Sequence, residues 1–176
     1  MERASFAKMK CPVARAADEI GDGWTLLLLR DAYKGAATFN EFQERLPIAP
    51  TTLTRKLEAL TSRGLFQKRI YQTNPPRERY ELTPKALDLL PVLVALGAWG
   101  NRWLAPEGEL LTIVDAVSGK PMDLAIVDRK TSQPVRAGQI ALKPGPGATK
   151  RTRKEMKLPL VLGGNHRGEG LHNADK

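Results

Sequence analysis

The feature that most constrains the fold of this 176-residue chain is a pair of amphipathic helical segments separated by only three residues. The two segments are Thr38–Leu46 and Pro50–Arg63, and the turn between them is Pro47–Ala49. Thr38 and Glu41 have the capping-box spacing, in which each side chain meets an unpaired backbone N–H of the other residue. Leu53, Leu57 and Leu60 recur at helical spacing, which predicts one narrow buried face. Such a pair favours a helix-turn-helix.

The flanking segments extend this motif into a winged helix-turn-helix. The further predicted elements are helices Pro12–Ile20 and Trp24–Tyr33, strands Leu65–Tyr71 and Arg79–Leu82 around the turn Asn74–Pro76, and a long apolar helix from Thr83 to Leu104. The two strands form a basic β-hairpin, the wing. Pro91 is expected either to bend the long helix or to split it in two. The expected fold class is therefore mainly α with a small β-hairpin wing, α+β.

Three regions of different composition are expected along the chain. They are a winged-helix domain that includes dimerisation helices (residues 8–105), a small β-rich extension (109–148) and a basic, disordered tail (149–176). In the extension, short apolar runs between Leu110 and Leu142 alternate with turn residues, which indicates two or three short strands. From Pro144 onward Gly, Pro, Lys and Arg dominate, so little apolar surface can be buried.

The whole chain has a formal net charge of +9, and its positive charge is concentrated in two segments. Between Arg45 and Arg79, eight Lys and Arg residues stand against two Glu residues, and between Lys150 and Lys157 five stand against one. A compact basic segment is typical of a polyanion partner, because phosphate contacts release counterions. The charge alone leaves two interpretations open, an interface for double-stranded DNA or a solvated basic surface.

Several other classes of protein are disfavoured. No window approaches the roughly 20 apolar residues of a membrane span, and no signal peptide is recognisable, so a cytoplasmic protein without membrane contact is expected. A single cysteine, Cys11, excludes an internal disulfide framework and a Cys-rich zinc site. His166 and His172 have no ligand-type neighbours, so neither a metal nor a cofactor is expected. The carboxylates of the extension pair with no nucleophile, so the chain is not expected to be an enzyme.

A resemblance to a known family runs through residues 8–104. The matching motifs are Cys11-Pro12-Val13, Gly23-Trp24-Thr25, Phe39-Asn40-Glu41-Phe42, Leu53-Thr54-Arg55-Lys56-Leu57, Asn74-Pro75-Pro76-Arg77, Tyr80-Glu81-Leu82-Thr83 and Leu90-Pro91-Val92-Leu93. With these motifs the chain resembles the HxlR-type transcription regulators. The resemblance implies a dimeric bacterial winged-helix DNA-binding regulator. Two positions depart from the family pattern, Ala49 where a capping Ser is usual and Lys56 where Arg is usual.

The segment Pro50–Arg63 corresponds to the recognition helix and is the strongest candidate for DNA contact. Its first turns would enter the major groove, where Arg reads guanine and Thr contacts a thymine methyl group or a phosphate. The predicted contacts on this helix are Pro50, Thr51, Thr52, Thr54, Arg55 and Lys56, with Lys56 assigned to a phosphate or to packing. The predicted contacts on the wing, to phosphates or the minor groove, are Gln72, Asn74, Arg77 and Arg79. The alternative is a solvated surface, or a winged-helix module that binds a protein and no DNA.

The apolar stripe of the long helix predicts a homodimer, and hence a pseudo-palindromic operator. The stripe consists of Leu93, Leu96, Trp99 and Trp103. A long helix that follows a wing and is apolar on more than one face suits a contact across a twofold axis. An intramolecular core and a pocket for an unidentified small-molecule effector are the alternatives.

Cys11 is a candidate redox residue. It precedes Pro12 at the expected N-cap of the first helix, where the positive end of the helix dipole stabilises negative charge. In some members of the family that the chain resembles, a cysteine at this place senses oxidants or electrophiles. The alternative is an inert, half-buried thiol.

Overall fold

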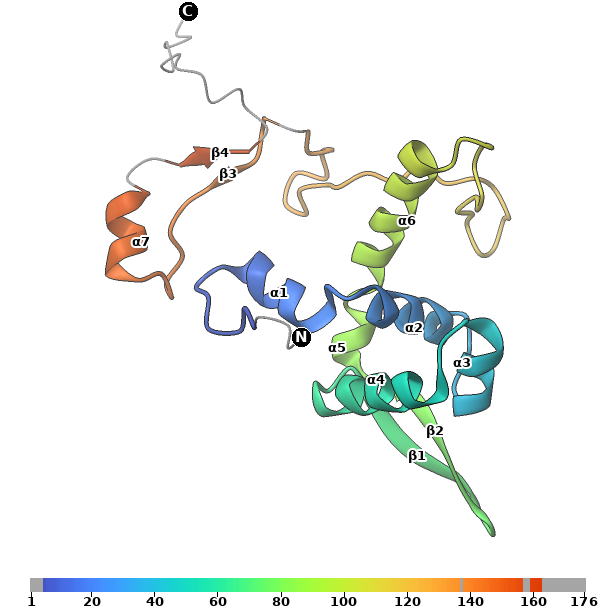
Figure 1. The fold of residues 1–176 in the computed structure, drawn as a ribbon. Coiled ribbons are helices and arrows are strands. Elements are labelled where there is room, and N and C mark those ends of the chain that lie inside the picture. Colours follow the sequence, from blue (N-terminus) through green and yellow to red (C-terminus); the bar gives the residue numbers. More distant parts are fainter. Residues whose placement is uncertain (1–4, 137, 157–158, 163–176) are drawn as a thin grey trace, which may run out of the picture. The chain divides into compact units, whose positions relative to one another are not determined.

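The computed structural model describes residues 5–136, 138–156 and 159–162 of the chain. The chain forms two compact units, Met1–Thr112 (unit 1) and Ile113–Lys176 (unit 2), which we describe separately. Unit 1 holds helices α1 to α6 and strands β1 and β2, and unit 2 holds β3, α7 and β4 (Figure 1).

Four helices open unit 1, and they are α1 (Pro12–Ile20), α2 (Gly23–Tyr33), α3 (Phe39–Arg45) and α4 (Pro50–Ser62). Side chains cap two of them, α2 and α3, and a proline stands in the first turn of the other two, α1 and α4. The Asp22 carboxylate caps α2 by accepting from the Trp24 N–H at 3.1 Å. The capping box of α3 is confirmed, since the Thr38 hydroxyl accepts from the Glu41 N–H and the Glu41 carboxylate accepts from the Thr38 N–H. Pro12 lies in the first turn of α1. The predicted ends agree with the structure to within one residue.

The core of unit 1 lies between α2, α3, α4 and the base of the hairpin. Its fully buried side chains include Leu28, Leu29, Phe42, Leu53, Leu57, Leu60, Leu65 and Phe66. The rings of Phe42 and Phe66 stack with their centroids 6.1 Å apart, and Tyr80 packs against both. The three leucines of α4 thus face inward as predicted, which leaves the opposite side of α4 to solvent.

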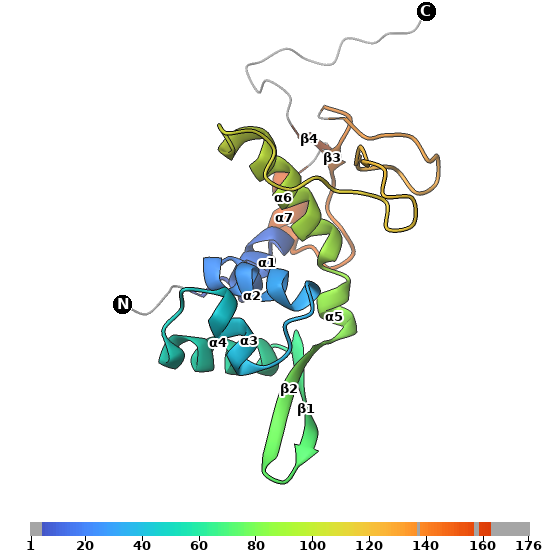
Figure 2. The same cartoon turned by 90° about the vertical axis from the view of Figure 1, so that its right-hand side faces the viewer.

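The predicted wing is an antiparallel hairpin of β1 (Phe66–Thr73) and β2 (Pro76–Leu82). Its register pairs Phe66 with Leu82, Arg69 with Arg79 and Gln72 with Arg77. The base is anchored to the helices, because the Tyr80 N–H donates to the Ala37 carbonyl at 2.6 Å. Beyond this anchor the hairpin projects away from the helices (Figure 2).

The long apolar helix is split into α5 (Pro84–Leu87) and α6 (Leu90–Leu104). Pro91 lies in the first turn of α6, where its missing N–H breaks no hydrogen bond, so the second of the two expectations for this proline is correct. No residue of α6 is buried, and Leu96, Trp99 and Trp103 are 45%, 52% and 65% exposed. Among the described residues no helix is both long and apolar enough to cross a membrane.

Unit 2 contains a short internal repeat that the sequence analysis missed. Residues 113–122 and 126–135 share the pattern Ile-Val-Asp-x-x-Ser/Thr-x-x-Pro-apolar, thirteen positions apart. Each copy folds into a turn closed by one isolated bridge, Val114 with Pro121 and Val127 with Pro134. In each copy the Asp carboxylate accepts hydrogen bonds from its own turn. These turns replace most of the two or three strands expected here. Where burial in unit 2 is described, no residue is buried.

The structure differs from the prediction of a disordered tail over residues 149–176. Within that range lie α7 (Lys150–Glu155) and β4 (Leu160–Val161), and β4 pairs antiparallel with β3 (Ala141–Leu142). The Thr149 hydroxyl caps α7 by accepting from the Thr152 N–H at 3.1 Å, which favours a helix start at this place. Residues 163–176, with His166 and His172, lie outside the described residues.

Candidate nucleic-acid interface

The outer face of α4 carries most of the predicted recognition residues. Pro50, Thr51, Thr54 and Arg55 are exposed, and Thr52 is half-buried. The Thr54 hydroxyl donates to the Pro50 carbonyl at 3.0 Å, which leaves its methyl group and its acceptor lone pairs for a partner. Arg55 makes no ion pair with any residue that the structure describes. Its guanidinium is therefore free to bind from solvent.

The start of α4 is open. No side chain caps it, since the residue before Pro50 is Ala49, as the departure from the family pattern implied. The first backbone N–H groups of a helix have no partner within the helix, and together they attract an anion. The N-terminus of α4 can therefore accept a phosphate oxygen.

Lys56 is held by the protein itself. Its ammonium nitrogen lies 2.8 Å from a carboxylate oxygen of Asp22, and its side chain is only 22% exposed. Asp22 also accepts from the Thr25 hydroxyl. Burial acts to raise the pKa of Asp22, but the hydrogen bonds from Lys56 and Thr25 outweigh it and lower that pKa below its ordinary value. Of the two roles predicted for Lys56, this geometry favours packing over phosphate contact.

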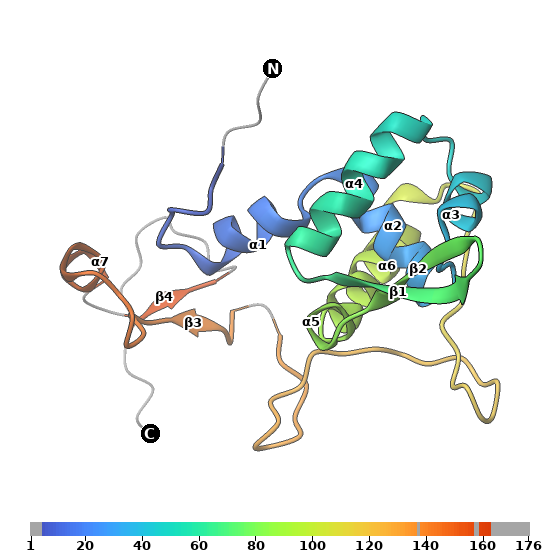
Figure 3. The ribbon, with the colours of Figure 1, turned by 90° about the horizontal axis from the view of Figure 1, so that it is seen from below.

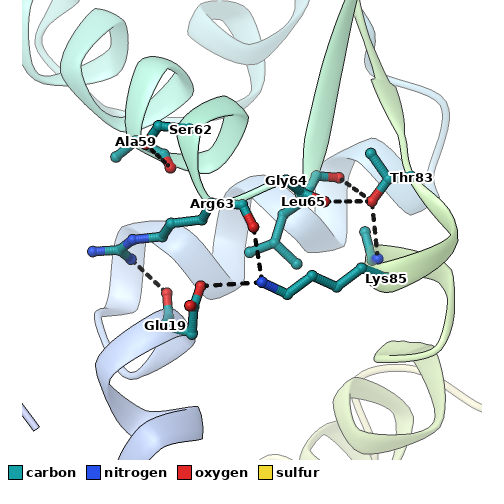
Figure 4. Close-up of polar contacts among 9 residues, drawn as sticks. Glu19, Ala59, Ser62, Arg63, Gly64, Leu65, Thr83 and Lys85 are labelled. Atoms are coloured by element: carbon teal, nitrogen blue, oxygen red, sulfur yellow. Dashed lines mark hydrogen bonds and ion pairs between the residues drawn. The ribbon is translucent and has the colours of Figure 1, made fainter. Parts of the chain in front are cut away.

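The C-terminal end of α4 is fastened to α1 and α5 (Figure 4). The Arg63 guanidinium donates to the Glu19 carbonyl at 2.5 Å. The Lys85 ammonium donates to the Arg63 carbonyl at 2.8 Å and lies 3.5 Å from the Glu19 carboxylate. Gly64 then turns the chain into β1 at φ +68°, a backbone conformation that favours glycine. Lys56 in the middle of α4 contacts Asp22, and Arg63 at its end contacts Glu19. The α1–α2 junction therefore sets the orientation of α4.

Among the described residues, the wing pairs most of its cations with carboxylates and leaves one, Arg77, without an ion pair. Arg79 donates to the Glu81 carboxylate at 2.8 Å, and Lys68 lies 2.9 Å from Glu78. The Gln72 amide donates to the Asn74 carbonyl at 3.0 Å within the tip. Arg77 is exposed and has no ion pair within the described part of the chain. Arg77 is thus the wing cation most available to a phosphate.

The structure brings the predicted recognition helix and wing together on one side of unit 1. The view from below shows α4 and the hairpin side by side, in front of α2 and α6 (Figure 3). The predicted dimer residues lie on α6, where Leu93 is half-buried and the others are exposed. Cys11 is the N-cap residue of α1, half-buried, with a free thiol.

Sequence reasoning missed the residues that position α4, namely Glu19, Asp22 and Lys85. Asp22 stands directly before the apolar helix α2, and Asp at that place is a capping signal. That signal could have predicted the cap on α2 but not the contact of Asp22 with Lys56. In the described residues no group of three or more His, Cys, Asp and Glu side chains could hold a metal ion.

A helix-turn-helix with an exposed polar face, followed by a projecting hairpin, defines the winged helix-turn-helix class of transcription regulators. The chain matches the HxlR-like helix-turn-helix family model over residues 19–108. It therefore belongs to the HxlR family, as the sequence motifs implied.

Individual similar proteins are also described as regulators. The HTH-type transcriptional regulator Rv3095 of Mycobacterium tuberculosis H37Rv is 33% identical over 136 residues, 77% of this chain and 86% of the relative. The crystal structure of PA1607, described as a candidate transcription factor, superposes with a TM-score of 0.72 at 33% identity, covering 80% of this chain and 99% of that one. The redox regulator HypR in its reduced form gives 0.50 at 31% identity over 55% of this chain and 99% of its own.

Proposed function

We propose that this protein is a homodimeric transcription regulator that binds a pseudo-palindromic DNA operator in the cytoplasm. The observation that carries the proposal is the exposed face of α4 from Thr51 to Arg55, together with the exposed Arg77 of the wing, which has no ion pair among the described residues. Thr51 to Arg55 lie on the second helix of the helix-turn-helix, which is fastened at its middle and at its end, and Arg77 lies on strand β2 of the wing. Membership of the HxlR family supports DNA as the partner.

The first turns of α4 enter the major groove in this proposal. Arg55 donates two hydrogen bonds to a guanine, because its planar guanidinium matches the O6 and N7 acceptors. Thr51, Thr52 and Thr54 supply methyl contacts to thymine and hydroxyl contacts to phosphates. The open helix start at Pro50 receives a phosphate oxygen. Lys56 acts through Asp22, by holding α4 at the correct angle.

The wing contacts the DNA backbone or the minor groove. Arg77 reaches a phosphate directly, since no carboxylate holds it in the described structure. Asn74 and Gln72 lie at the tip beside it and offer amide groups. Arg79 can add to the contact only by exchanging its Glu81 partner for a phosphate. Such contacts position the protein without reading sequence.

The dimer contact lies on α6. Leu96, Trp99 and Trp103 are exposed in the single chain, and a contiguous apolar face of this kind is typical of a protein interface. A twofold axis between two α6 helices pairs the same surface on both subunits. The two recognition helices then meet half-sites about 34–36 Å apart, one turn of DNA, or a multiple of that distance.

The test is a selection of genomic fragments that bind the purified protein, followed by titration of a selected and a random-sequence duplex at several salt concentrations. Affinity for both should fall as salt rises, and the selected duplex should bind at least about 1,000-fold more tightly. Absence of salt-dependent binding to either duplex would contradict the proposal. It would leave the winged-helix protein–protein module as the better interpretation.

We also propose that DNA binding responds to oxidation at Cys11 or to a small-molecule effector. The thiol is partly accessible at the N-cap of α1, and α1 is joined through Glu19 to the end of the recognition helix. That the similar protein HypR is named a redox regulator supports the redox form of the proposal. DNA affinity of the wild type and C11S is measured before and after peroxide. Peroxide should change the DNA affinity of the wild type and leave that of C11S unchanged. An equal change in both proteins would contradict the proposal of redox control at Cys11.

A further inference from the structure

Helix α7 carries a concentration of positive charge that the proposed interface does not use. From Lys150 to Lys157 the chain has five cationic residues and one Glu. Lys150, Arg153 and Lys154 lie at i, i+3 and i+4, so they share one face of the helix, and all three are exposed. Within the described residues, the one ion pair of α7 joins Arg151 to Glu155 at 2.6 Å. The shared face therefore keeps its full charge.

This basic helix is held in a defined conformation. The Thr149 hydroxyl caps its first turn, and the Arg153 guanidinium donates to the carbonyls of Gly145 and Pro146 at 3.0 and 2.8 Å. The strands before and after it, β3 and β4, pair antiparallel and close the segment into a loop. The Leu162 N–H extends this pairing by donating to the Ile140 carbonyl at 2.7 Å. These contacts hold α7 and its cationic face in one conformation.

Like charges four residues apart, such as Lys150 and Lys154, destabilise a helix on its own. A polyanion removes that repulsion. The two lysines are about 6 Å apart along the helix at a rise of about 1.5 Å per residue. Over that length one strand of duplex DNA carries about two phosphate charges, at about one per 3.4 Å. The charge density of this face therefore suits a DNA backbone.

We propose that α7 is a second contact of this protein with duplex DNA, made to phosphates and independent of sequence. This inference rests on the proposed function, because a DNA-binding regulator meets duplex DNA as its principal polyanion. It adds a contact outside the recognition helix and the wing. The three cations of this face, joined by Arg151 when it exchanges Glu155 for a phosphate, would make the affinity of the whole protein for any duplex fall more steeply as salt rises.

The test compares three full-length proteins on a random-sequence duplex over a range of salt concentrations. They are the wild type, the variant K150Q/R151Q/R153Q/K154Q, and a control variant of equal charge change in the turns of unit 2, K120Q/R129Q/K130Q/R136Q. Each phosphate contact contributes about 0.9 to the slope of log affinity against log salt. The α7 variant should lower that slope by about 2–4, whereas the control should leave it near the wild-type value.

A smaller variant, K150Q/K154Q, keeps the Arg153 and Arg151 contacts that hold the helix, and it should lose about half of the effect. An α7 variant with the wild-type slope, or a control with the same loss as the α7 variant, would overturn the inference. The inference would also be overturned if the α7 variant lost binding to anionic phospholipid vesicles but bound DNA as the wild type does. Failure of the proposed function is separate, because then the wild type itself binds no duplex.

Discussion

Two helices of unit 1, α4 and α6, are similar in length and opposite in what they do with their apolar side chains. Helix α4 has 13 residues with three charged side chains, and it buries Leu53, Leu57 and Leu60 completely. Helix α6 has 15 residues with one charged side chain, Arg102, and it buries none. The more polar helix is therefore the one built into the core.

An apolar stripe can therefore stabilise the single chain or bind a partner. The stripe of α4 meets α2, α3 and the hairpin base, so its removal costs folding energy. The stripe of α6 stays half-exposed, which is the state expected of a surface completed by a second subunit. The predictions below test the contrast between the two helices, beginning with the largest expected effect.

L57A should be the most damaging substitution for the isolated fold. Leu57 is fully buried, and Leu→Ala at such a site costs about 2.7–5 kcal/mol, because the cavity relaxes only partly. Urea unfolding followed by circular dichroism measures the loss. The matched change on α6, L96A, should cost less than about 1 kcal/mol at protein concentrations too low for association. Equal losses would show that α6 is also part of the monomer core.

L96E/W99E should separate the subunits and leave each one folded. A carboxylate buried without a partner is strongly unfavourable, so the dimer should weaken by about 2 kcal/mol or more. Sedimentation measures the association, and circular dichroism checks the fold. V117E, at a residue that is 97% exposed in unit 2, is the control and should stay dimeric. A folded L96E/W99E protein that still dimerises would place the interface elsewhere.

R55A should weaken operator binding by about 1–3 kcal/mol and relax the preference at one base pair in each half-site. R77A should weaken all duplexes alike and lower the salt slope by about one, because a phosphate contact reads no sequence. Fluorescence anisotropy with operator and random duplexes measures both. If neither change alters the titration of the operator, the assignment of the α4 outer face and the wing is wrong.

D22N and K56M should have similar effects that do not add. Both break the Lys56–Asp22 contact, while Asn at position 22 still caps α2. If the pair positions α4, each change should weaken operator binding by about 1 kcal/mol and the double variant by no more than either. If Lys56 instead contacts a phosphate, K56M alone should lower the salt slope for random duplex by about one.

The same pair predicts a pH dependence of stability. The pKa of Asp22 is lowered in the folded protein, so the unfolded chain binds the proton more readily. The stabilising contribution is therefore complete above the ordinary pKa of 3.8 and is lost as the pH falls through the lowered value. Denaturant unfolding of wild type and D22N between neutral and acidic pH measures it. The difference between the two proteins should shrink at the acidic end.

The local part of this structure was predictable from neighbouring residues. The capping box of Thr38 and Glu41, the prolines that open α1 and α4, and the glycine after α4 all act over a few positions. Because these signals are short-range, the helix ends and the wing could be read from the sequence. The turns of unit 2 were not predicted, because the repeat is short and none of the residues of unit 2 whose burial is described is buried in an apolar core.

Residue order was enough to predict the helix-turn-helix, the hairpin after it and the polar face of α4, since hydrophobic period and capping follow directly from that order. Which of the described cations lack an ion pair became known only from the packed helices. Lys56 is 34 positions from Asp22, whose carboxylate it pairs with. Whether Arg55 is free and Lys56 is held depends on which distant carboxylate the packed helices bring within reach. An ion pair forms through space, and the spacing of residues along the chain carries no record of it.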